Sequence, residues 1–516
     1  MAQPDLTRDT ICVSEMILDS STEQSVELDY FLPDYYPNIF KILKTSITPS
    51  IQSQKIAGNK LTMDGIACIR IHYLAENTNR ICCVEQKAPF SKAIDLPSEC
   101  RNPVIQIVPR CYFANGRAVN QRRLDIRGGI SCKVRILEQR EESVVSGGSG
   151  QGLQCHCRNL PACCARKTAC KSFVVTEDLE LGSAKPAFGA ALGLHSTAVP
   201  TECRLIANKA ICKGDLTLHL FYQPEEETAA PETMDFSIPI SQIVDLPGLE
   251  EDYLCDARFE VTGVSLEPKA DESGQNRILS CEFTANLFCT ADRNQEYQIV
   301  DDAYSTAYES TLVSRPAAAE RVLQATDLVM TTKHTVDSGG TAISAVYDAA
   351  AVFGDAAVKQ ENGELFVCGN LEVSAFCHGG DGIPFLVEKT IPVELKVLGG
   401  LGAPEIGFLP SVDVLSTGFS ILSENQLELR TELRVSGMIY ERNRFQAISD
   451  ISIQEDAAKV RDALCALRIC YADPGDRIWD IAKTYSTSMG AVMEENGLED
   501  EVLSEHTMLL IPLIDG

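Results

Sequence analysis

The chain lacks the features that would assign it to a membrane, secreted or nucleic-acid-binding class. It has no run of about 18 consecutive apolar residues, which a membrane-spanning helix requires. Its first residues, Met1–Thr10, are polar and contain no apolar signal core, so we expect a protein that stays in a reducing cytoplasm. Basic residues are few, with 45 Lys and Arg against 73 Asp and Glu, which argues against nonspecific binding to nucleic acid.

The sequence also lacks the short motifs of common catalytic sites. It contains no phosphate-binding Gly-x-x-x-x-Gly-Lys-Ser/Thr loop, no Gly-x-Ser-x-Gly nucleophile turn and no His-Glu-x-x-His metal helix. Its seven histidines are scattered, and His72 and His219 lie in strand-like runs where we expect a structural role. We therefore predict that the protein is not an enzyme.

What the sequence does contain is an internal repeat. Residues 36–73 and 185–222 align without a gap at a constant offset, and a weaker third copy includes Gly369–Phe376. Within the copies, runs such as Leu216–Tyr222 alternate apolar and polar residues, which is the mark of a strand with one buried face. The pattern predicts a mainly β protein of three repeated antiparallel sandwich-like or barrel-like modules, followed by a small βααβ domain.

The repeats and the changes in composition suggest a division of the chain. The predicted parts, in chain order, are an N-terminal segment (1–23), module 1 (24–138), a Gly/Cys-rich linker (139–171), module 2 (172–292), a connector (293–326), module 3 (327–455) and the C-terminal domain (466–516). The linker contains Gly147–Gly152, a composition typical of flexible segments.

The C-terminal part has a period and a motif of its own. A strand at Leu467–Tyr471 is followed by Gly475-Asp-Arg-Ile-Trp-Asp-Ile-Ala482, then by Asn496-Gly-Leu498 and a closing apolar strand. This pattern resembles a LysM domain, a family that usually binds N-acetylglucosamine polymers in a groove between two loops. The resemblance implies one binding loop at Gly475, Asp476, Arg477 and Ile478, with Trp479 beside it, and a second loop that begins at Asn496, Gly497 and Leu498.

Two features of this domain favour a protein partner over a sugar. The second loop, Glu499–Glu505, is strongly acidic, and His506 stands where the family usually has glycine. Trp479, the sole tryptophan, has two open interpretations. It is either a core residue of the small domain or a partly exposed anchor at the binding face.

The front of module 1, Val26–Leu43, resembles the opening of the SPOCS domain of endospore-forming bacteria. Three such modules with one LysM domain resemble the SipL-type spore-coat morphogenetic proteins. The resemblance implies a scaffold in the mother-cell cytoplasm, at the forespore surface. It also implies a partner, a coat ATPase like stage IV sporulation protein A. The alternative from another class is a peptidoglycan-binding protein of the cell wall or spore cortex.

One cysteine-rich stretch is a candidate metal site. The chain has 21 cysteines, most of them expected as free thiols. The candidate ligands in the stretch are Cys155, His156, Cys157, Cys163, Cys164 and Cys170. Zinc takes four such ligands, usually in pairs two to four residues apart, and this spacing is irregular. Zinc binding, disulfide cross-linking and a linker with no single role remain open, and no other cofactor is expected.

Charge is distributed unevenly along the chain. Residues 1–171 hold 22 Lys and Arg against 17 Asp and Glu, whereas the acidic residues predominate in the remainder. Arg117, Arg122, Arg123 and Arg127 lie close together in module 1. They form either a solvated basic face or a contact for an acidic surface, such as another copy of the chain. The second interpretation predicts salt-sensitive self-association.

Overall fold

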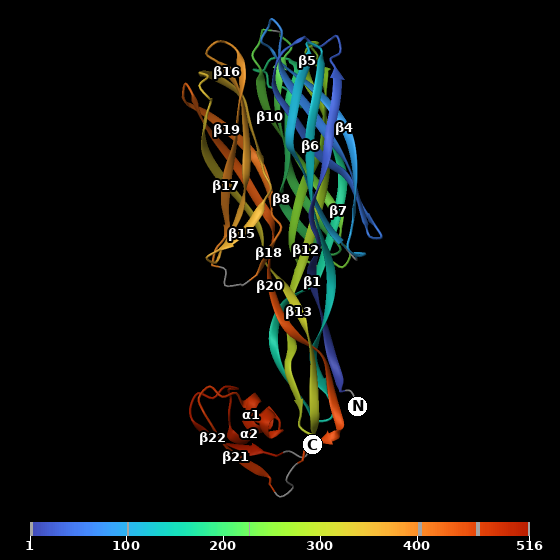
Figure 1. Cartoon of the computed structure of the whole chain (residues 1–516), viewed down its shortest axis with the longest axis vertical. Helices are drawn as coiled ribbons and strands as arrows, with labels where there is room; N and C mark the ends of the chain where they lie inside the picture. Colours follow the sequence, from blue (N-terminus) through green and yellow to red (C-terminus); the bar gives the residue numbers. More distant parts are fainter. Residues whose placement is uncertain (1–3, 101–102, 227, 401–404, 461–464, 514–516) are drawn as a thin grey trace.

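We describe a computed structural model of the protein, covering residues 4–100, 103–226, 228–400, 405–460 and 465–513. The molecule is elongated, with three β-sandwiches at one end, a narrow stalk of strands, and a small domain with both helices at the other end (Figure 1). The prediction of a mainly β protein is confirmed. No helix in the described ranges is long and apolar enough to span a membrane.

Three units of the chain have the same strand order. Each contains six strands in two antiparallel sheets, and in the third unit two of these strands are divided in two. The first unit has β1 (Asp5–Phe31), β2 (Ile39–Ala57), β3 (Lys60–Ala75), β4 (Ile81–Asp95), β5 (Pro103–Asn120) and β6 (Arg123–Ser149). The second has β7 (Leu153–Glu180), β8 (Phe188–Ile206), β9 (Lys209–Pro224), β10 (Glu232–Asp245), β11 (Leu254–Ala270) and β12 (Asn276–Ser305). The third has β13 (Tyr308–Asp337), β14 (Ile343–Phe353), β15 (Ala357–Glu361), β16 (Glu364–Gly379), β17 (Pro384–Leu398), β18 (Ile406–Phe408), β19 (Ser411–Ser423) and β20 (Gln426–Ala458).

In each unit one sheet contains the first, fifth and last of the six strands, and the other contains the second, third and fourth. The sheet orders are β1-β6-β5 with β2-β3-β4, then β11-β12-β7 with β10-β9-β8, then β13-β20-β18/β19 with β14/β15-β16-β17. The strands form because apolar side chains alternate toward the space between the sheets, as in β3, where Leu61 and Met63 are fully buried. The hairpin turn before the central strand has a residue of positive φ in every unit, namely Gly58, Asn208 and Asn362.

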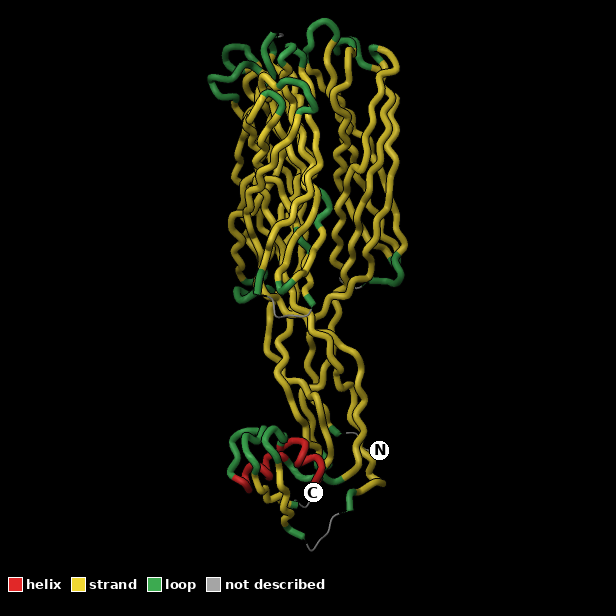
Figure 2. The backbone as a smooth tube through the Cα atoms, turned by 60° about the vertical axis from the view of Figure 1, so that its left-hand side comes forward, coloured by secondary structure: helices red, strands yellow, loops and turns green. Residues whose placement is uncertain are grey.

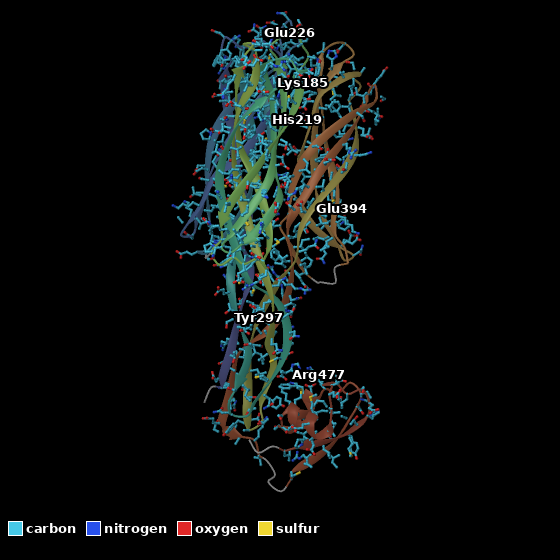
Figure 3. All side chains as sticks on the ribbon, turned by 180° about the vertical axis from the view of Figure 1, so that it is seen from behind. Lys185, His219, Glu226, Tyr297, Glu394 and Arg477 are labelled. Carbon is cyan, nitrogen blue, oxygen red and sulfur yellow. The ribbon has the colours of Figure 1, made fainter. Side chains whose placement is uncertain are left out.

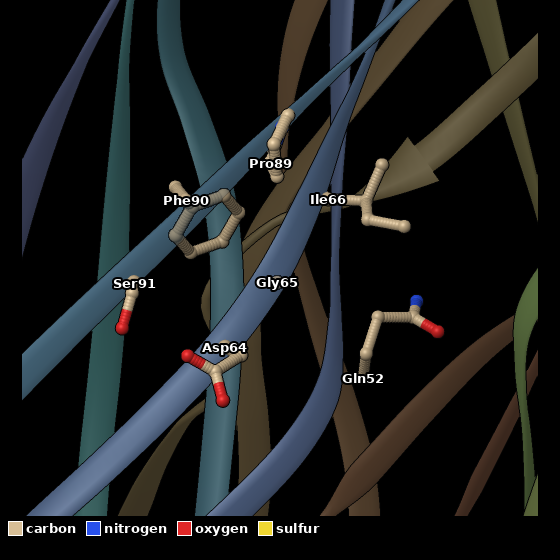
Figure 4. A pocket seen from close by; sticks show the side chains of 7 residues that line it. All are labelled: Gln52, Asp64, Gly65, Ile66, Pro89, Phe90 and Ser91. Carbon is tan, nitrogen blue, oxygen red and sulfur yellow. The ribbon is translucent and has the colours of Figure 1, made fainter.

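A glycine covered by an aromatic ring recurs in the central strand of all three units. Figure 4 shows the first case, where Phe90 lies beside Gly65. A Cβ on Gly65 would lie 2.4 Å from the Phe90 ring and 2.6 Å from the Ser50 carbonyl oxygen. A Cβ on Gly369 would lie 2.5 Å from the Phe353 ring, and one on Gly214 would lie 2.4 Å from the Val199 carbonyl oxygen and 2.9 Å from the Phe259 ring. The repeated glycine therefore provides room for close packing between strands.

The first and last strands of each unit continue beyond the sandwich and form the stalk, which is the narrow middle part in Figure 2. The three ribbons are β1 with β6, β7 with β12, and β13 with β20. They enclose two small apolar clusters, one around Ile11, Leu160 and Tyr297 and another around Val300 and Ile451. The stalk thus has a core of its own.

The stalk is where the predicted division of the chain differs from the structure. Residues 1–3 of the predicted N-terminal segment (1–23) lie outside the described residues. The rest of that segment, the linker (139–171) and the connector (293–326) lie almost wholly in paired strands of the stalk and of its junction with the sandwiches. The glycine-rich run suggested flexibility, but Gly147 and Gly148 pair with Thr7 and Leu6 in the β1–β6 ladder. Composition alone was misleading here because pairing with a distant strand, rather than local propensity, orders these residues.

A buried network of charged and polar side chains joins the three ribbons where the stalk meets the sandwiches. Arg166 Nε donates to Asp292 Oδ1 at 2.5 Å, and Tyr440 donates to Asp292 Oδ2 at 2.7 Å. Glu320 accepts from the Ser14 backbone nitrogen at 2.9 Å and also pairs with Arg442. Asp292 is fully buried and Glu320 nearly so. Since these side chains and the Ser14 backbone nitrogen come from all three ribbons, the network fixes how the units are arranged around the stalk.

The three sandwiches also contact one another directly. His72, Phe221 and Phe376 stand at equivalent places in the three central strands. The Phe376 ring lies 4.9 Å from the His72 ring and 5.4 Å from the Phe221 ring. His72 Nε2 hydrogen-bonds to the Leu192 carbonyl at 2.6 Å, and burial lowers its pKa to about 4. The geometry supports a structural role for His72.

The C-terminal domain has β21 (Leu467–Ala472), α1 (Ile478–Tyr485), α2 (Met489–Asn496) and β22 (Thr507–Pro512) in that order, with β21 and β22 paired. Ser488 caps α2 by accepting a hydrogen bond from the Ala491 nitrogen at 3.1 Å, and Gly497 ends it with φ of 61°. Both helices pack on one face of the two-stranded sheet, around Ile478, Val492 and Leu509.

Candidate functional site

The predicted first binding loop is divided between the surface and the core of the C-terminal domain. Gly475, Asp476 and Arg477 are exposed, whereas Ile478 is fully buried among the core residues. Asp476 Oδ2 accepts from the backbone nitrogen of Asp473 at 2.9 Å, which closes the turn that leads into α1. The exposed part of the loop is available to a ligand, and Ile478 holds the helix in place.

The predicted second loop begins with residues that stabilise the fold. The side chain of Asn496 donates to the carbonyls of Val492 and Leu510 and accepts from the Leu510 nitrogen, at 2.7 to 2.8 Å. It therefore fastens α2 to β22. Gly497 is the left-handed end of α2, and Leu498 packs against the core. The Asn-x-Leu part of the motif thus has a clear structural function.

The two loops are joined to each other by backbone hydrogen bonds. The Gly475 nitrogen donates to the Leu503 oxygen at 2.7 Å, and the Leu503 nitrogen donates to the Asp476 oxygen at 3.0 Å. The Ile478 nitrogen donates to the Glu501 oxygen at 2.9 Å. At these positions the loops contact each other along their backbones. A ligand that lay between them would have to replace those bonds.

Trp479 is buried against the foot of the stalk, which neither of its two interpretations included. Its side chain does not belong to the small domain's apolar cluster, and only 3% of the residue is exposed. The indole ring lies 4.9 Å from the ring of Tyr304 and 5.1 Å from the ring of His156, both in stalk strands. Trp479 thus fixes the C-terminal domain to the stalk.

Charged side chains surround this contact. Asp302 accepts hydrogen bonds from Trp479 Nε1 and from Lys483 Nζ, each at 2.7 Å. Burial alone would raise the pKa of Asp302, but these hydrogen bonds outweigh burial and lower that pKa. The Tyr304 hydroxyl donates to the Thr487 carbonyl at 2.7 Å, which ties the start of α2 to the same strand.

His156 joins the predicted loop to the stalk. His156 Nδ1 lies 2.5 Å from Asp301 Oδ1, and Arg477 donates to His156 Nε2 at 2.9 Å. Both contacts are satisfied by the neutral tautomer with its proton on Nδ1, an assignment that follows from the hydrogen-bond network. The hydrogen bond to His156 thus holds the Arg477 side chain against the stalk. Figure 3 shows Arg477 on the small domain and Tyr297 higher in the stalk.

A shallow cavity of about 410 Å³ lies beside the first loop. Its lining includes the exposed loop residues and one face of α1, from Asp480 to Tyr485. A second cavity of the same volume lies in the first sandwich around Phe90 and Gly65 (Figure 4). The ionisable side chain at that second cavity is Asp64, whose pKa is lowered by hydrogen bonds from Ser91 and Ser53.

The outer face of the two-stranded sheet presents apolar side chains to solvent, a feature that the sequence analysis missed. Leu467, Ile469 and Tyr471 alternate along β21, and Met508 lies opposite Tyr471 on β22. Tyr471 is 81% exposed and Ile469 is 58% exposed. The alternation in β21 was visible in the sequence, but nothing showed that the helices cover the other face alone. We call these four residues the outer apolar face.

The six residues of the predicted metal cluster are not brought together. They lie along the extended strand β7, where each residue adds about 3.3 Å, so Cys155 and Cys170 are roughly 50 Å apart. Cys163 and Cys164 instead contact Asp292 and Arg293 near the top of the stalk. Close spacing in sequence does not bring ligands together when the segment is a strand.

The arginines of the predicted basic face are largely occupied within the first unit. Arg122 donates to the carbonyls of Leu32 and Pro33, and Arg123 pairs with Asp29. Arg277 makes the same carbonyl contacts in the second unit, at Leu181, which marks this as a feature of the repeat. Self-association through this face stays a prediction.

Comparison with known protein families finds a match for two segments of the chain. Residues 38–108 and 195–269 match the family model described as SipL, SPOCS domain. The matched segments run from β2 into β5 of the first unit and from β8 through β11 of the second. The match indicates a sporulation-related protein. No curated protein and no solved structure matches the chain.

Proposed function

We propose that the protein is a non-enzymatic scaffold of spore coat assembly that works in the mother-cell cytoplasm, at the forespore surface. The observation that carries the proposal is the match of two units to the SipL, SPOCS domain family. The elongated shape supports it, because a stalk with its own core separates three sandwiches from a small terminal domain (Figure 2). Such an arrangement suits a spacer that connects two partners.

The proposed partner of the C-terminal domain is a basement-layer coat ATPase like stage IV sporulation protein A. The outer apolar face supports a protein partner because exposed apolar side chains that gather on one sheet face are typical of interaction sites. Tyr471 is the large aromatic side chain on this face, and tyrosine is enriched among residues that contribute most to protein interfaces. The stalk covers Trp479, so the partner would dock on the sheet and the exposed loop beside it.

A second candidate is binding of peptidoglycan through N-acetylglucosamine units. The observation that favours it is the cavity beside the first loop, whose volume of about 410 Å³ is within the range of small-ligand sites. Its lining offers polar groups from Asp480 and Thr484 and an aromatic side chain from Tyr485. This candidate and the first differ in the surface that they use.

The test uses the full chain and measures capture of the purified coat ATPase and of N-acetylglucosamine oligomers in parallel. Ile469→Ser with Tyr471→Ser changes the outer apolar face, and we expect capture of the ATPase to fall at least about tenfold. Arg468→Ser is the matched control, because Arg468 directly precedes Ile469 on the same strand and its side chain is on the other face. Equal capture by the double variant and the wild-type chain would contradict the proposed docking surface.

The glycan arm uses Asp480→Asn with Thr484→Val, which changes the cavity and leaves the outer apolar face intact. The second candidate would replace the first if the wild-type chain binds the oligomers and does not capture the ATPase, and if this variant no longer binds the oligomers. Circular dichroism of each variant shows whether the domain remains folded.

A further inference from the structure

Four cysteine side chains meet inside the second sandwich. They come from four strands and from both sheets: Cys203 (β8), Cys212 (β9), Cys255 (β11) and Cys289 (β12). The Sγ of Cys203 lies 3.3 Å from that of Cys212 and 3.2 Å from that of Cys255, and the Sγ atoms of Cys255 and Cys289 are 3.4 Å apart. We call these residues the thiol cluster.

The strand register explains why the four side chains converge. Cys203 and Cys212 are directly opposite each other in the β8–β9 hairpin. On the facing sheet, Cys289 is opposite Ala257, two residues from Cys255, so the second pair is a diagonal neighbour pair. Both pairs point between the sheets. Cys289 is three residues before Asp292, so the cluster lies at the end of the sandwich from which the stalk begins.

The other units show that the fold does not require cysteine at these places. In the first unit the residues paired like Cys203 and Cys212 are Gln54 and Met63. In the third unit they are Val358 and Val367. On the facing sheet of the first unit, Ile105 and Val134 occupy the places of Cys255 and Cys289. Other side chains, from the polar Gln54 to the buried Met63 and Val134, occupy these places, so four thiols at once are a property of the second unit.

The geometry suits a metal ion better than it suits four thiols. In a tetrahedral zinc–thiolate site the metal–sulfur distance is about 2.3 Å, which separates the sulfurs by about 3.8 Å. The sulfurs of Cys203, Cys255 and Cys289 all lie within 4.8 Å of one another, and Cys212 contacts the first of them. Small movements of side chains would bring all four to the required spacing.

Zinc is ligated by thiolates, so an ion in the thiol cluster would take the place of the protons that the four thiols carry.

We propose that the thiol cluster is a structural site for one zinc ion, held by four thiolates between the two sheets of the second unit. On binding, each thiol that becomes a ligand releases its proton to solvent, and the zinc keeps its oxidation state. The ion would fasten β8 and β9 to β11 and β12 next to the buried polar network of the stalk. Disulfides join sulfurs in pairs, whereas Cys203 and Cys255 each contact two other sulfurs, an arrangement that one shared ion satisfies.

The experiment measures metal content of the full chain purified under reducing conditions without added chelator. We expect about one zinc per chain by mass spectrometry of the elements. The test variant is Cys212→Met with Cys289→Val, which places the first unit's own core residues in the second unit, so that the sandwich can still form. Its zinc content should fall at least tenfold. The control is Cys157→Ser with Cys170→Ser, which should retain the zinc.

Cobalt provides a second measurement that does not depend on a variant. Replacing zinc by Co²⁺ in the wild-type chain should give the thiolate-to-metal charge-transfer and visible bands of tetrahedral sulfur coordination, and these bands should be absent from the Cys212→Met, Cys289→Val chain. A wild-type chain that takes up neither ion under reducing conditions would overturn the proposal. A disulfide between any two of the four cysteines in chain prepared without oxygen would overturn it as well.

Discussion

The indole nitrogen of Trp479 donates a hydrogen bond of 2.7 Å to Oδ2 of Asp302, across 177 positions of the sequence. This bond joins the C-terminal domain to the foot of the stalk, and Lys483 neutralises the same carboxylate. Asp302 of β12 thus binds two side chains of α1 and contributes to the orientation of the small domain, and hence of its outer apolar face. Because the chain has a single tryptophan, its fluorescence reports on this contact alone.

Replacing Asp302 by alanine should release the C-terminal domain from the stalk. Trp479 would lose its hydrogen bond and the shielding by Tyr304, so we expect its emission maximum to shift to longer wavelength. The far-ultraviolet circular dichroism should not change. Glu494→Ala, on the exposed face of α2, is the control and should leave the emission unchanged. An unshifted spectrum in the Asp302 variant would show that this bond does not hold the domain.

Acid should weaken the same contact. The pKa of Asp302 is lowered in the folded chain, so its contribution to docking is complete above the usual aspartate pKa of about 3.9 and is lost as the pH falls through the lower folded value. Tryptophan emission followed from pH 6 downward should therefore shift within the acidic range. The Asp302→Asn chain should lack this shift, and an identical titration in both chains would contradict the assignment.

Alkaline pH should loosen the contact between the second and third sandwiches. His219 Nε2 lies 2.8 Å from Asp348 Oδ1 and Nδ1 lies 2.5 Å from Asp235 Oδ1. Burial alone would lower the pKa of His219, but the hydrogen bonds to Asp348 and Asp235 raise it to about 9. The neighbouring His195 is buried, with a pKa lowered to about 4, and stays neutral above that.

The raised pKa sets the pH window of that effect. The stability from protonated His219 is complete below about pH 6.5 and is lost as the pH rises through about 9. We expect a loss of about 1–2 kcal/mol across this window, seen as a falling unfolding temperature. His219→Gln should flatten the pH dependence between these values. The same slope in the variant and the wild-type chain would count against the histidine.

The buried network at the top of the stalk should be sensitive to the loss of one partner. Asp292→Ala leaves Arg166 buried without its main counter-ion, which costs about 3–5 kcal/mol. Hydrogen exchange should then become faster in the stalk strands near Ser14 and Glu320. Asp29→Ala breaks the solvent-exposed pair with Arg123 and should cost far less stability, because water screens that pair. Equal costs for the two variants would mean that the network is not buried in solution.

The repeated glycine predicts a clear difference between two alanine substitutions. Gly65→Ala would place a Cβ 2.4 Å from Phe90 and should destabilise the first sandwich by about 1–3 kcal/mol. Gly490→Ala, on α2, meets no atom within 4 Å and should stabilise its helix by about 0.5–1 kcal/mol. Denaturant unfolding measures both. A neutral Gly65→Ala would show that the ring of Phe90 moves aside freely.

Local patterns in the sequence determined the class of the fold. Alternation of apolar residues specified strands such as β3 and β9 because a sheet with one buried face imposes a period of two. Glycine and asparagine marked the turns, since Gly58 and Asn208 have positive φ. The order of elements in the C-terminal domain followed from helical spacing around Trp479 and the stop at Gly497. Each of these signals is local, and so the sequence alone carries it.

Contacts between distant residues decided the remainder. The stalk depends on pairings such as Ser14 with Glu320, 306 positions apart, which no local pattern encodes. The same holds for the burial of Trp479 by β12. Among the cysteines, the closely spaced group along β7 is spread out by its strand, whereas Cys203 and Cys289 meet because two sheets face each other. A sequence records which side chains are present, but only the packing of sheets determines which of them meet.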